Sequence, residues 1–391
     1  MRITIVGGGM ITHDQILPSF YQLQRLGSAE EIAICARHDQ TLQALADSRQ
    51  LTQAFPGQNF RSYAGDYRDT LARATARNLA VIALPDHLHF EAVMAALGAD
   101  QHVLVVKPLV MKLAEAETIE REALRRGLFV GVEYHKRFDD RSLLARRKYR
   151  AGEFGEFRLG AACLMEKWYY RHSNFQNWCT SENSDAFAYI GCHYVDLVHF
   201  ITGLLPVAVS VYGIKEEYPN GQEGFLWTDA RVVWSNGACL NVQNSLGFPD
   251  EAPGTNTQGL TLYCGGRTNG ALIRHSDQFR GVEHVYIARP EGAGATICAE
   301  PSPDYFQYVD LGAGGLTPVG YGYRSIEYLF RCCQRVESAP DRRRAIREID
   351  REGIAATPAN SRYNEQVIEA GRKSILEGGS TVSIGSGPEP A

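Results

Sequence analysis

Short apolar runs separated by longer amphipathic segments characterise the first 125 residues. The runs "RITIVGGG", "EEIAICARH", "LAVIALP", "HVLVVKP" and "LFVGVEYH" each contain an unbroken apolar stretch. Such continuity is typical of strands that are covered on both faces of a sheet. Segments of helix length lie between the runs, and this alternation predicts a parallel, doubly wound α/β sheet with right-handed crossovers.

The hydrophobic pattern changes after residue 150. Longer segments such as "EFRLGAACLME", "AVSVYGIKEEY" and "LTLYCGG" alternate apolar and polar positions, as antiparallel strands with one covered face do. Residues 184–203 instead carry apolar side chains at helical spacing and end at Gly203. This part of the chain is therefore predicted to be an α+β domain, in which a helix packs on an open antiparallel sheet.

Charge and cysteine content exclude several classes of protein. The formal net charge of -5 over 391 residues supplies no field that would collect nucleic acid or an anionic membrane. The basic stretch 342–352 carries interleaved acids, which favours a solvated helix face. The nine cysteines show no CxxC pair and no metal-type spacing. We therefore expect no metal site, reduced thiols and a cytoplasmic protein without a membrane span.

A glycine-rich turn follows the first predicted strand. A dinucleotide-binding fold needs such a turn because backbone amides at a helix N-terminus must approach a pyrophosphate. Gly7 and Gly9 occupy the first two positions of this fingerprint, with Met10 and Ile11 behind them, whereas the third position is Thr12. We predict an N-terminal Rossmann domain in which Gly7, Gly9, Met10 and Ile11 bind the cofactor.

The end of the second strand bears on the choice between NAD and NADP. An acid there usually binds the ribose of NAD, whereas a basic residue accommodates the 2′-phosphate of NADP. The acid position holds Ala36, and Arg37 and His38 follow, although Asp39 is one position further on. We expect NAD(P) with a slight preference for NADP, and we count Arg37 and His38 as cofactor-binding residues.

A lysine ends the apolar run "HVLVVKP". Ligands of open α/β sheets bind beyond the carboxyl ends of the strands, and Lys107 occupies such an end. Pro108 fixes the backbone directly after it. We therefore expect Lys107 to face the cofactor, with an ordinary loop charge as the alternative.

With these features the chain resembles the Gfo/Idh/MocA family of glucose–fructose oxidoreductases and inositol dehydrogenases. The resemblance covers nearly the whole chain and rests on the order and spacing of "IVGGGMIT", "ALPDHLHFEAVMAAL", "QHVLVVKP", "YHKRFDD", "GEFGEF", "YIGCHYVDL" and "YNEQVIEAGRKSILEGG". It implies an N-terminal Rossmann domain, a C-terminal open antiparallel sheet, and oxidation of a secondary hydroxyl of a sugar or cyclitol with NAD(P).

The resemblance also implies roles for single residues. Lys107 matches the lysine of the family's Glu-Lys-Pro motif, which is expected to hydrogen-bond the reacting hydroxyl. His193 matches the family's general acid/base, and an ordinary histidine pKa of about 6.5 suits proton exchange near neutral pH. By its position one helical turn later, Asp196 is suited to orient a side chain or cap a contact, with an ordinary surface carboxylate of the helix as the alternative. The family's turn beneath the cofactor matches Pro85, Asp86, His87 and His89, although loop and helix-cap positions are the alternative for the two histidines.

Two positions depart from the family pattern. Val106 stands where the motif has its glutamate, and Tyr189 stands four residues before His193, where the family commonly has an aspartate. A tyrosine can donate a hydrogen bond to a substrate oxygen and exchange protons with a neighbouring lysine. We therefore count Tyr189 with Lys107 and His193 as catalytic.

The segment "EKWYYRHSNFQNW" is rich in aromatic and amide side chains. Aromatic faces and hydrogen-bond donors are what a sugar ring requires, whereas packing at a domain interface is the alternative. We take Trp168, Arg171 and His172 as substrate-binding residues, and Tyr321 or Tyr323 could add to them.

These features predict an NAD(P)-dependent dehydrogenase that acts on a secondary hydroxyl of a sugar, cyclitol or glycoside. One alternative is a redox-neutral glycosidase in which bound NAD oxidises the sugar only transiently. Another is a non-catalytic dinucleotide-binding sensor, which the Val106 and Tyr189 departures suggest.

The hydrophobic patterns predict four segments. A Rossmann domain at 1–125 and a connecting segment at 126–150 precede a substrate and oligomerisation domain at 151–338, and a helical return with a disordered tail occupies 339–391. An open sheet with an uncovered apolar face predicts a homo-oligomer, either a dimer or a tetramer.

Overall fold

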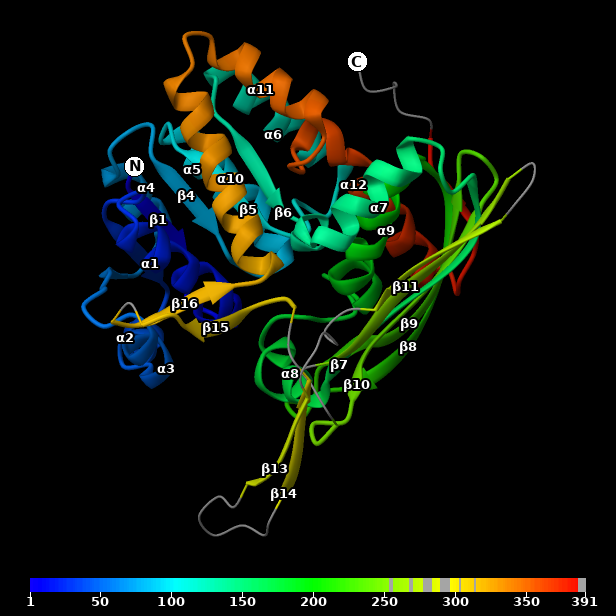
Figure 1. Ribbon diagram of the computed structural model, residues 1–391, viewed down its shortest axis with the longest axis horizontal. Coiled ribbons are helices and arrows are strands. Elements are labelled where there is room, and N and C mark those ends of the chain that lie inside the picture. The colour runs from blue at the N-terminus through cyan, green and yellow to red at the C-terminus, as the bar shows by residue number, and fades with distance from the viewer. Residues whose placement is uncertain are drawn as a thin grey trace. The chain divides into compact units, whose positions relative to one another are not determined.

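The computed structural model describes residues 1–252, 256–266, 270–276, 283–288, 296–301, 304–312 and 314–385. The chain forms two compact units that alternate along the sequence (Figure 1). The first unit contains residues 1–138 and 306–365, and the second contains residues 139–305 and the segment from residue 366.

The first unit contains the predicted parallel sheet. Its six strands lie in the order β3-β2-β1-β4-β5-β6, and every neighbouring pair is parallel. The strands are β1 (Ile3–Val6), β2 (Ile32–Ala36), β3 (Arg61–Ala64), β4 (Leu79–Ile82), β5 (His102–Val106) and β6 (Val130–Glu133). β1, β4, β5 and β6 are buried at every position, as their continuous apolar runs predicted. The edge strand β3 is exposed at every position, so the hydrophobic pattern did not predict it.

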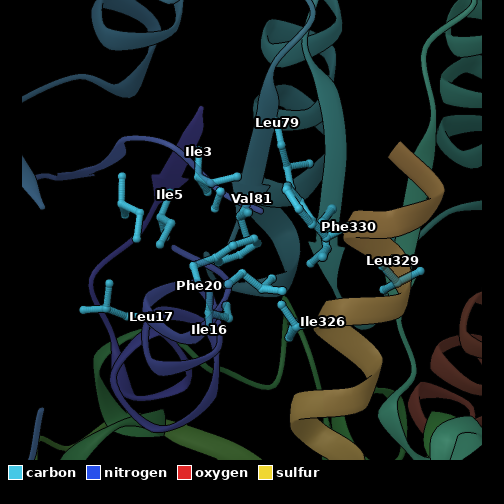
Figure 2. Close-up of a cluster of buried hydrophobic side chains, with 14 of the residues drawn as sticks. Ile3, Ile5, Ile16, Leu17, Phe20, Leu79, Val81, Ile326, Leu329 and Phe330 are labelled. Carbon is cyan, nitrogen blue, oxygen red and sulfur yellow. The ribbon is translucent and has the colours of Figure 1, made fainter. Parts of the chain in front are cut away.

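Helices cover this sheet and complete its core. They are α1 (Leu17–Arg25), α2 (Asp39–Ala46), α3 (Arg49–Ala54), α4 (Tyr67–Arg73), α5 (His89–Gly98), α6 (Leu113–Arg126), α10 (Tyr321–Ser338) and α11 (Arg342–Glu352). Figure 2 shows α10 side chains among those of the sheet and α1, and the rings of Phe20 and Phe330 meet edge to face at 5.9 Å. α11 buries one apolar stripe and exposes its charged face, as expected for 342–352.

The compact units therefore divide the chain at other positions than the predicted boundaries. β6 continues the sheet past residue 125 because it pairs with β5. α10 precedes residue 338, yet it belongs to the core of the first unit. A return of the chain to the first core cannot be read from local periodicity, because an amphipathic helix fits any apolar surface.

The second unit contains a seven-stranded sheet in the order β12-β11-β7-β10-β9-β8-β17. The strands are β7 (Glu156–Lys167), β8 (Pro206–Glu217), β9 (Glu223–Trp234), β10 (Cys239–Phe248), β11 (Asn256–Gly265), β12 (Ala271–Ser276) and β17 (Val382–Ser383). Neighbouring strands are antiparallel except β7 and β10, which are parallel. The sheet is thus mixed where an antiparallel one was predicted, because the chain leaves β7 by a long helical connection rather than by a hairpin.

The helices of the second unit include the predicted segment 184–203. A π-helical turn (Phe187–Gly191) leads into α9 (Cys192–Thr202), which ends at Gly203 with a left-handed φ of 80°. The other helices are α7 (Asp140–Arg150), which packs against α9, α8 (Trp168–Ser173) and the C-terminal part of α12 (Pro358–Leu376).

Two further pairs of strands complete the described chain. They are β13 (Glu283–Ala288) with β14 (Thr296–Pro301), and β15 (Gln307–Asp310) with β16 (Leu316–Val319). The tail predicted to be disordered lies, from residue 386, outside the described residues. Within the described ranges, no helix combines the length and the apolar character needed to cross a bilayer.

Candidate active site

The turn after β1 requires glycine at its first position. Gly7 has a φ of +106°, and a Cβ added there would lie 2.1 Å from the carbonyl oxygen of Ala83, directly after β4. Its amide donates to Cys35 O at 2.9 Å. Gly7 therefore holds the turn close to both neighbouring strands, which is the backbone geometry that a dinucleotide fold uses.

Gly9 and Thr12 complete this turn in different ways. A Cβ added at Gly9 would meet no heavy atom of the described residues within 4 Å, so the backbone there is open to close approach by a ligand. The Thr12 side chain is fully buried, and its hydroxyl donates to Gly7 O at 2.8 Å. Thr12, at the third position of the fingerprint, thus stabilises the turn by a hydrogen bond instead of by the close packing that glycine allows. The open backbone at Gly9 leaves space for a pyrophosphate.

The end of β2 lies beside this turn. A Cβ added at Gly8 would come within 2.8 Å of Thr41 Cγ2 on α2, so the turn packs on the first half of that helix. Ala36 is the last residue of β2, and Arg37 and His38 follow with exposed side chains. Both side chains are therefore accessible at this edge of the sheet, next to the glycine turn.

A buried histidine joins the turns that follow β4 and β5. His89, the first residue of α5, has no exposed surface, and its ring nitrogens lie 2.7 Å from Pro108 O and 2.8 Å from Leu84 O. Lys107 is half-buried directly after β5. His89 therefore fixes the backbone on which Lys107 is placed. The remaining residues predicted at this edge are half-buried, except the exposed His87: Met10, Ile11, Pro85 and His87.

Glu133, at the end of β6, was not among the predicted residues. Its side chain is buried, and its carboxylate accepts hydrogen bonds from Gln15 Nε2 at 2.8 Å and Ser325 Oγ at 2.5 Å. His135 Nδ1 lies 3.0 Å from the other carboxylate oxygen, and the His135 ring stacks on Tyr321. A charged residue at the end of an apolar strand was the available sequence signal, as for Lys107.

In the second unit, His193 and Asp196 share one helix. Both side chains are buried in α9, and their spacing of three residues places them on the same side of the helix. The chain before α9 is firmly held, because Asp185 accepts from Ala188 N at 2.8 Å and pairs with Arg372 of α12 at 2.8 Å. Arg372 also donates to the carbonyl oxygens of Ser181, Glu182 and Ser184.

Tyr189 lies in the π-helical turn, half-buried within an aromatic cluster. Its ring meets Phe175 edge to face at 4.6 Å and Trp178 at 5.7 Å. The segment predicted to bind a sugar ring is thus in contact with the residue that replaces the family's aspartate.

The other residues of that segment are less closely grouped. Arg171 forms an ion pair with Glu216 of β8 and donates to Glu217 O at 3.1 Å. Trp168 and His172 are exposed. Tyr321 and Tyr323 belong to α10 of the first unit, where burial raises the pKa of Tyr323 to about 12.

Two buried polar side chains in the second sheet also lacked a sequence prediction. Asn244 of β10 and Thr228 of β9 are register partners. The Asn244 amide and the Thr228 hydroxyl have no hydrogen-bond partner among the described residues. A Cβ added at Gly191 would lie 2.6 Å from Asn244 Oδ1. Leaving such groups unsatisfied costs about 1–3 kcal/mol each, so this position suits a bound water or ligand hydroxyl.

The described residues contain no group of three or more His, Cys, Asp or Glu side chains that could hold a metal ion. The candidate functional groups of the first unit are the glycine turn Gly7–Gly9, Lys107 and Glu133. The candidate functional groups of the second unit are His193, Asp196 and Tyr189.

Comparison with known proteins finds a family that is similar to the first part of the chain. Residues 1–134 match the model of a family described as "Oxidoreductase family, NAD-binding Rossmann fold". Residues 1–134 are thus similar to the Gfo/Idh/MocA oxidoreductase family. The predicted resemblance to this family and the predicted fold class are thereby confirmed, and the Gly7–Gly9 turn lies within the part of the chain that is similar to an NAD-binding Rossmann fold.

Curated relatives are similar over part of the chain. D-glucoside 3-dehydrogenase of Escherichia coli is 24% identical over 217 residues, which are 54% of this chain and 56% of that protein. The NADP⁺-dependent scyllo-inositol 2-dehydrogenase of Bacillus subtilis is 31% identical over 77 residues, 20% of this chain and 22% of that protein. The chain thus spans about half or less of the length of these relatives.

Solved structures of dehydrogenases share the fold over nearly the whole chain. Scyllo-inositol dehydrogenase from Lactobacillus casei, with NAD(H) and scyllo-inositol bound, has a TM-score of 0.66 at 15% identity and covers 98% of this chain and 99% of its own. The WlbA dehydrogenase from Bordetella pertussis, in complex with NADH and UDP-GlcNAcA, has a TM-score of 0.67 at 16% identity, with 98% of each chain covered.

Proposed function

We propose that the chain is an NAD(P)-dependent dehydrogenase that oxidises a secondary hydroxyl of a sugar, cyclitol or glycoside. The proposal depends mainly on the glycine turn Gly7–Gly9 of the first unit. Gly7 packs closely against the backbone of Ala83, while the backbone at Gly9 is open to a ligand. The family match over residues 1–134 and the glucoside and inositol dehydrogenases among the relatives support it.

The proposed chemistry divides between the two units. When bound, the cofactor supplies the nicotinamide carbon that accepts the hydride. Lys107 hydrogen-bonds the reacting hydroxyl, and His193 takes its proton as the general base, with Lys107 sharing or relaying that proton. Asp196 lies on the same side of α9 as His193 and keeps the site polar there.

Tyr189 and the aromatic segment form the proposed substrate side. The Tyr189 hydroxyl donates to a substrate oxygen, while its ring is fixed by Phe175 and Trp178. Trp168 and His172 offer exposed surface to a sugar ring. Arg171 is also assigned to substrate binding, and its ion pair with Glu216 fixes the position of its side chain.

The proposed cofactor is NAD(P) with a slight preference for NADP. The support is the exposed pair Arg37 and His38 after Ala36, beside the glycine turn. A basic side chain in this place neutralises a 2′-phosphate, whereas the Asp39 carboxylate would favour the free ribose hydroxyl of NAD.

Absorbance at the reduced-nicotinamide band tests this function. Purified enzyme would be incubated with NAD or NADP and with inositols, aldoses and glycosides in turn. We expect at least one polyol to reduce the cofactor, with NADP at least as effective as NAD. Cofactor binding without reduction by any polyol would favour the redox-neutral glycosidase or the sensor instead.

A further inference from the structure

Three polar side chains of the first unit form a chain of hydrogen bonds that the proposed function does not use. Two of them, His13 and Asp14, lie in the π-helical turn Thr12–Ile16, and the third, Ser48, directly precedes α3. His13 Nδ1 lies 2.7 Å from Asp14 Oδ1, and His13 Nε2 lies 2.8 Å from Ser48 Oγ. A hydroxyl, an imidazole and a carboxylate thus follow one another in the order of a Ser-His-Asp triad.

The partners of each group fix the direction of these hydrogen bonds. An ionised carboxylate can only accept, so Nδ1 of the neutral His13 ring carries the hydrogen and donates it to Asp14. The lone pair of Nε2 then accepts from the Ser48 hydroxyl. The Leu51 amide donates to Ser48 Oγ at 3.4 Å, which leaves the hydroxyl hydrogen for the imidazole. His13 is therefore placed as a base for Ser48, and Asp14 holds the tautomer that this requires.

The exposure of the three groups indicates which molecules could react there. The side chains of His13 and Asp14 are 27% and 48% exposed, and Ser48 is half-buried. A small molecule from solution can therefore reach the imidazole. A carboxylate in contact with water stabilises a neighbouring imidazolium less than a buried carboxylate does. We therefore expect reaction with esters that have a good leaving group, rather than with ordinary esters or amides.

Helix capping is the competing explanation for Ser48. It is the N-cap of α3, and serine is preferred at such positions because its oxygen accepts from the backbone of the first turn. Capping uses only the acceptor capacity of Ser48 Oγ and requires neither His13 nor Asp14. The two explanations therefore differ in what the loss of the imidazole does to the reactivity of the serine.

We propose that Ser48 is a nucleophile that takes the acyl group of small activated esters, with His13 as its general base and Asp14 orienting His13. Ser48 Oγ forms a bond to the carbonyl carbon, and the bond from that carbon to the leaving oxygen breaks. The Ser48 proton passes to His13 Nε2 and then to the leaving oxygen. Water, deprotonated by His13 in the same way, then releases the carboxylic acid and restores the serine. This inference goes beyond the proposed dehydrogenase function and does not depend on it.

A fluorophosphonate probe tests the nucleophile on the full chain, without any dehydrogenase substrate. An activated serine displaces fluoride from the phosphorus of the probe and keeps the phosphonyl group. Mass spectrometry of the intact chain and of its peptides should find one adduct, on Ser48. In His13→Gln the labelling rate should fall roughly 100-fold or more, as the loss of a general base predicts.

Asp14 is a positioning residue in this proposal, so its variants separate orientation from folding. Asp14→Asn should lower the labelling rate at least roughly tenfold, because the amide no longer fixes the tautomer of His13. Asp14→Glu restores the carboxylate and should recover part of the lost rate. Far-UV circular dichroism should be the same in both variants and in the wild type.

Ser380→Ala provides the matched control. Ser380 is exposed, and its hydroxyl donates directly to a carboxylate oxygen of Glu377 at 2.8 Å instead of to an imidazole. Ser380→Ala should be labelled at the wild-type rate, whereas Ser48→Ala should give no adduct. Ser48→Ala should also lose the hydrolysis of p-nitrophenyl acetate that the wild type shows.

Several results would overturn the proposal. They are a folded wild type that carries no adduct on Ser48, and labelling of Ser48 at an unchanged rate in folded His13→Gln. Equal hydrolysis of p-nitrophenyl acetate by the wild type and Ser48→Ala would mean that an imidazole reacts in place of the serine. If His13→Gln does not fold, the rate in Asp14→Asn decides. Reduction of NAD or NADP by polyols, which tests the dehydrogenase, is measured separately, so either proposal can fail alone.

Discussion

Gly7 and Gly9 lie two residues apart, yet the structure assigns them separate tasks. A Cβ at Gly7 would collide with Ala83 O, whereas a Cβ at Gly9 would meet only open space within the described residues. We expect Gly7→Ala to lower the free energy of unfolding by about 1–3 kcal/mol, because the strained φ and the collision both oppose folding. Urea unfolding measures this change.

Gly9→Ala is the matched control for the cofactor site. Its stability should stay within about 0.5 kcal/mol of the wild type. Its affinity for NAD(P)H in a fluorescence titration should fall at least roughly tenfold, because the methyl group occupies the space in which a pyrophosphate approaches the backbone. Wild-type affinity in Gly9→Ala would show that the cofactor does not approach this turn.

Asp350 of α11 predicts a pH-dependent stability. Burial raises the pKa of Asp350 from its usual range to about 6, despite a hydrogen bond from Thr357 Oγ1 at 2.6 Å. The folded state therefore favours the protonated acid. The stability that depends on protonated Asp350 is therefore fully present below about pH 4. It is lost as the pH rises through about 6.

Asp350→Asn removes the free-energy cost of ionising this buried carboxyl group. The asparagine keeps a side-chain oxygen that can accept the hydrogen bond from Thr357. At pH 8 we expect the free energy of unfolding to rise by about 1–3 kcal/mol, and at pH 4 we expect no gain. Denaturant unfolding at the two pH values measures the difference. An equal gain at both would indicate a cause other than the titration of Asp350.

Single residues were predictable where chemistry and strand position coincide. Gly7, Gly9, Lys107 and His193 each stand at an element end that the pattern identifies, although their roles in binding and catalysis stay predictions. Glu133 was missed because Gln15 and Ser325, which fix it, lie 118 and 192 residues away along the chain.

At the scale of elements, α9 depends on an ion pair with α12. Arg372 pairs with the buried Asp185 and binds three carbonyl oxygens of the chain before the helix. Arg372→Met leaves a buried carboxylate unpaired, so the free energy of unfolding should fall by about 3–5 kcal/mol. Because α9 carries His193, kcat should fall while cofactor binding by the first unit is kept.

Arg362→Met is the control on the same helix. Arg362 pairs with Glu120 at 3.2 Å, and both side chains are partly exposed, so its loss should cost at most about 1 kcal/mol. Denaturant unfolding and steady-state kinetics compare the two variants. Equal losses of stability would mean that the Asp185 pair has no special importance for α9.

The elements themselves were largely predictable. Continuous apolar runs predicted five of the parallel strands, and Gly203 predicted the end of α9. The edge strand β3 has no buried position to mark it. The parallel pairing of β7 with β10 depends on the path of the connecting chain, which local alternation does not encode.

At the scale of the whole molecule, one face of the second sheet predicts self-association. Leu159, Tyr263 and Leu272 are neighbours in register across β7, β11 and β12, and each is more than half exposed. Exposed apolar patches of this kind mark interaction sites, so we propose a dimer or tetramer formed through this face.

Sedimentation at micromolar concentration tests the oligomer. The wild type should sediment as a dimer or larger species, and the double variant Leu159→Glu, Tyr263→Glu should sediment as a smaller species with unchanged far-UV circular dichroism. A monomeric wild type would refute the proposal, and an unchanged assembly of the variant would place the interface elsewhere.

Two domains could be expected from the length and from the change of pattern at residue 150. The interleaving of the two units along the sequence could not be expected. The reason is that α10 and α11 belong to the core of the first unit although they follow the strands of the second sheet in sequence. Only the pairing of surfaces distant in sequence determines that return.

The molar yield of reduced cofactor distinguishes a dehydrogenase from the alternatives. With the best polyol in excess and NAD or NADP supplied at many equivalents, absorbance gives the moles of reduced cofactor formed per mole of enzyme. A dehydrogenase should form many equivalents, limited only by reaction equilibrium. A yield that never exceeds one equivalent would contradict the account, because the cofactor would then be restored in each cycle or not used at all.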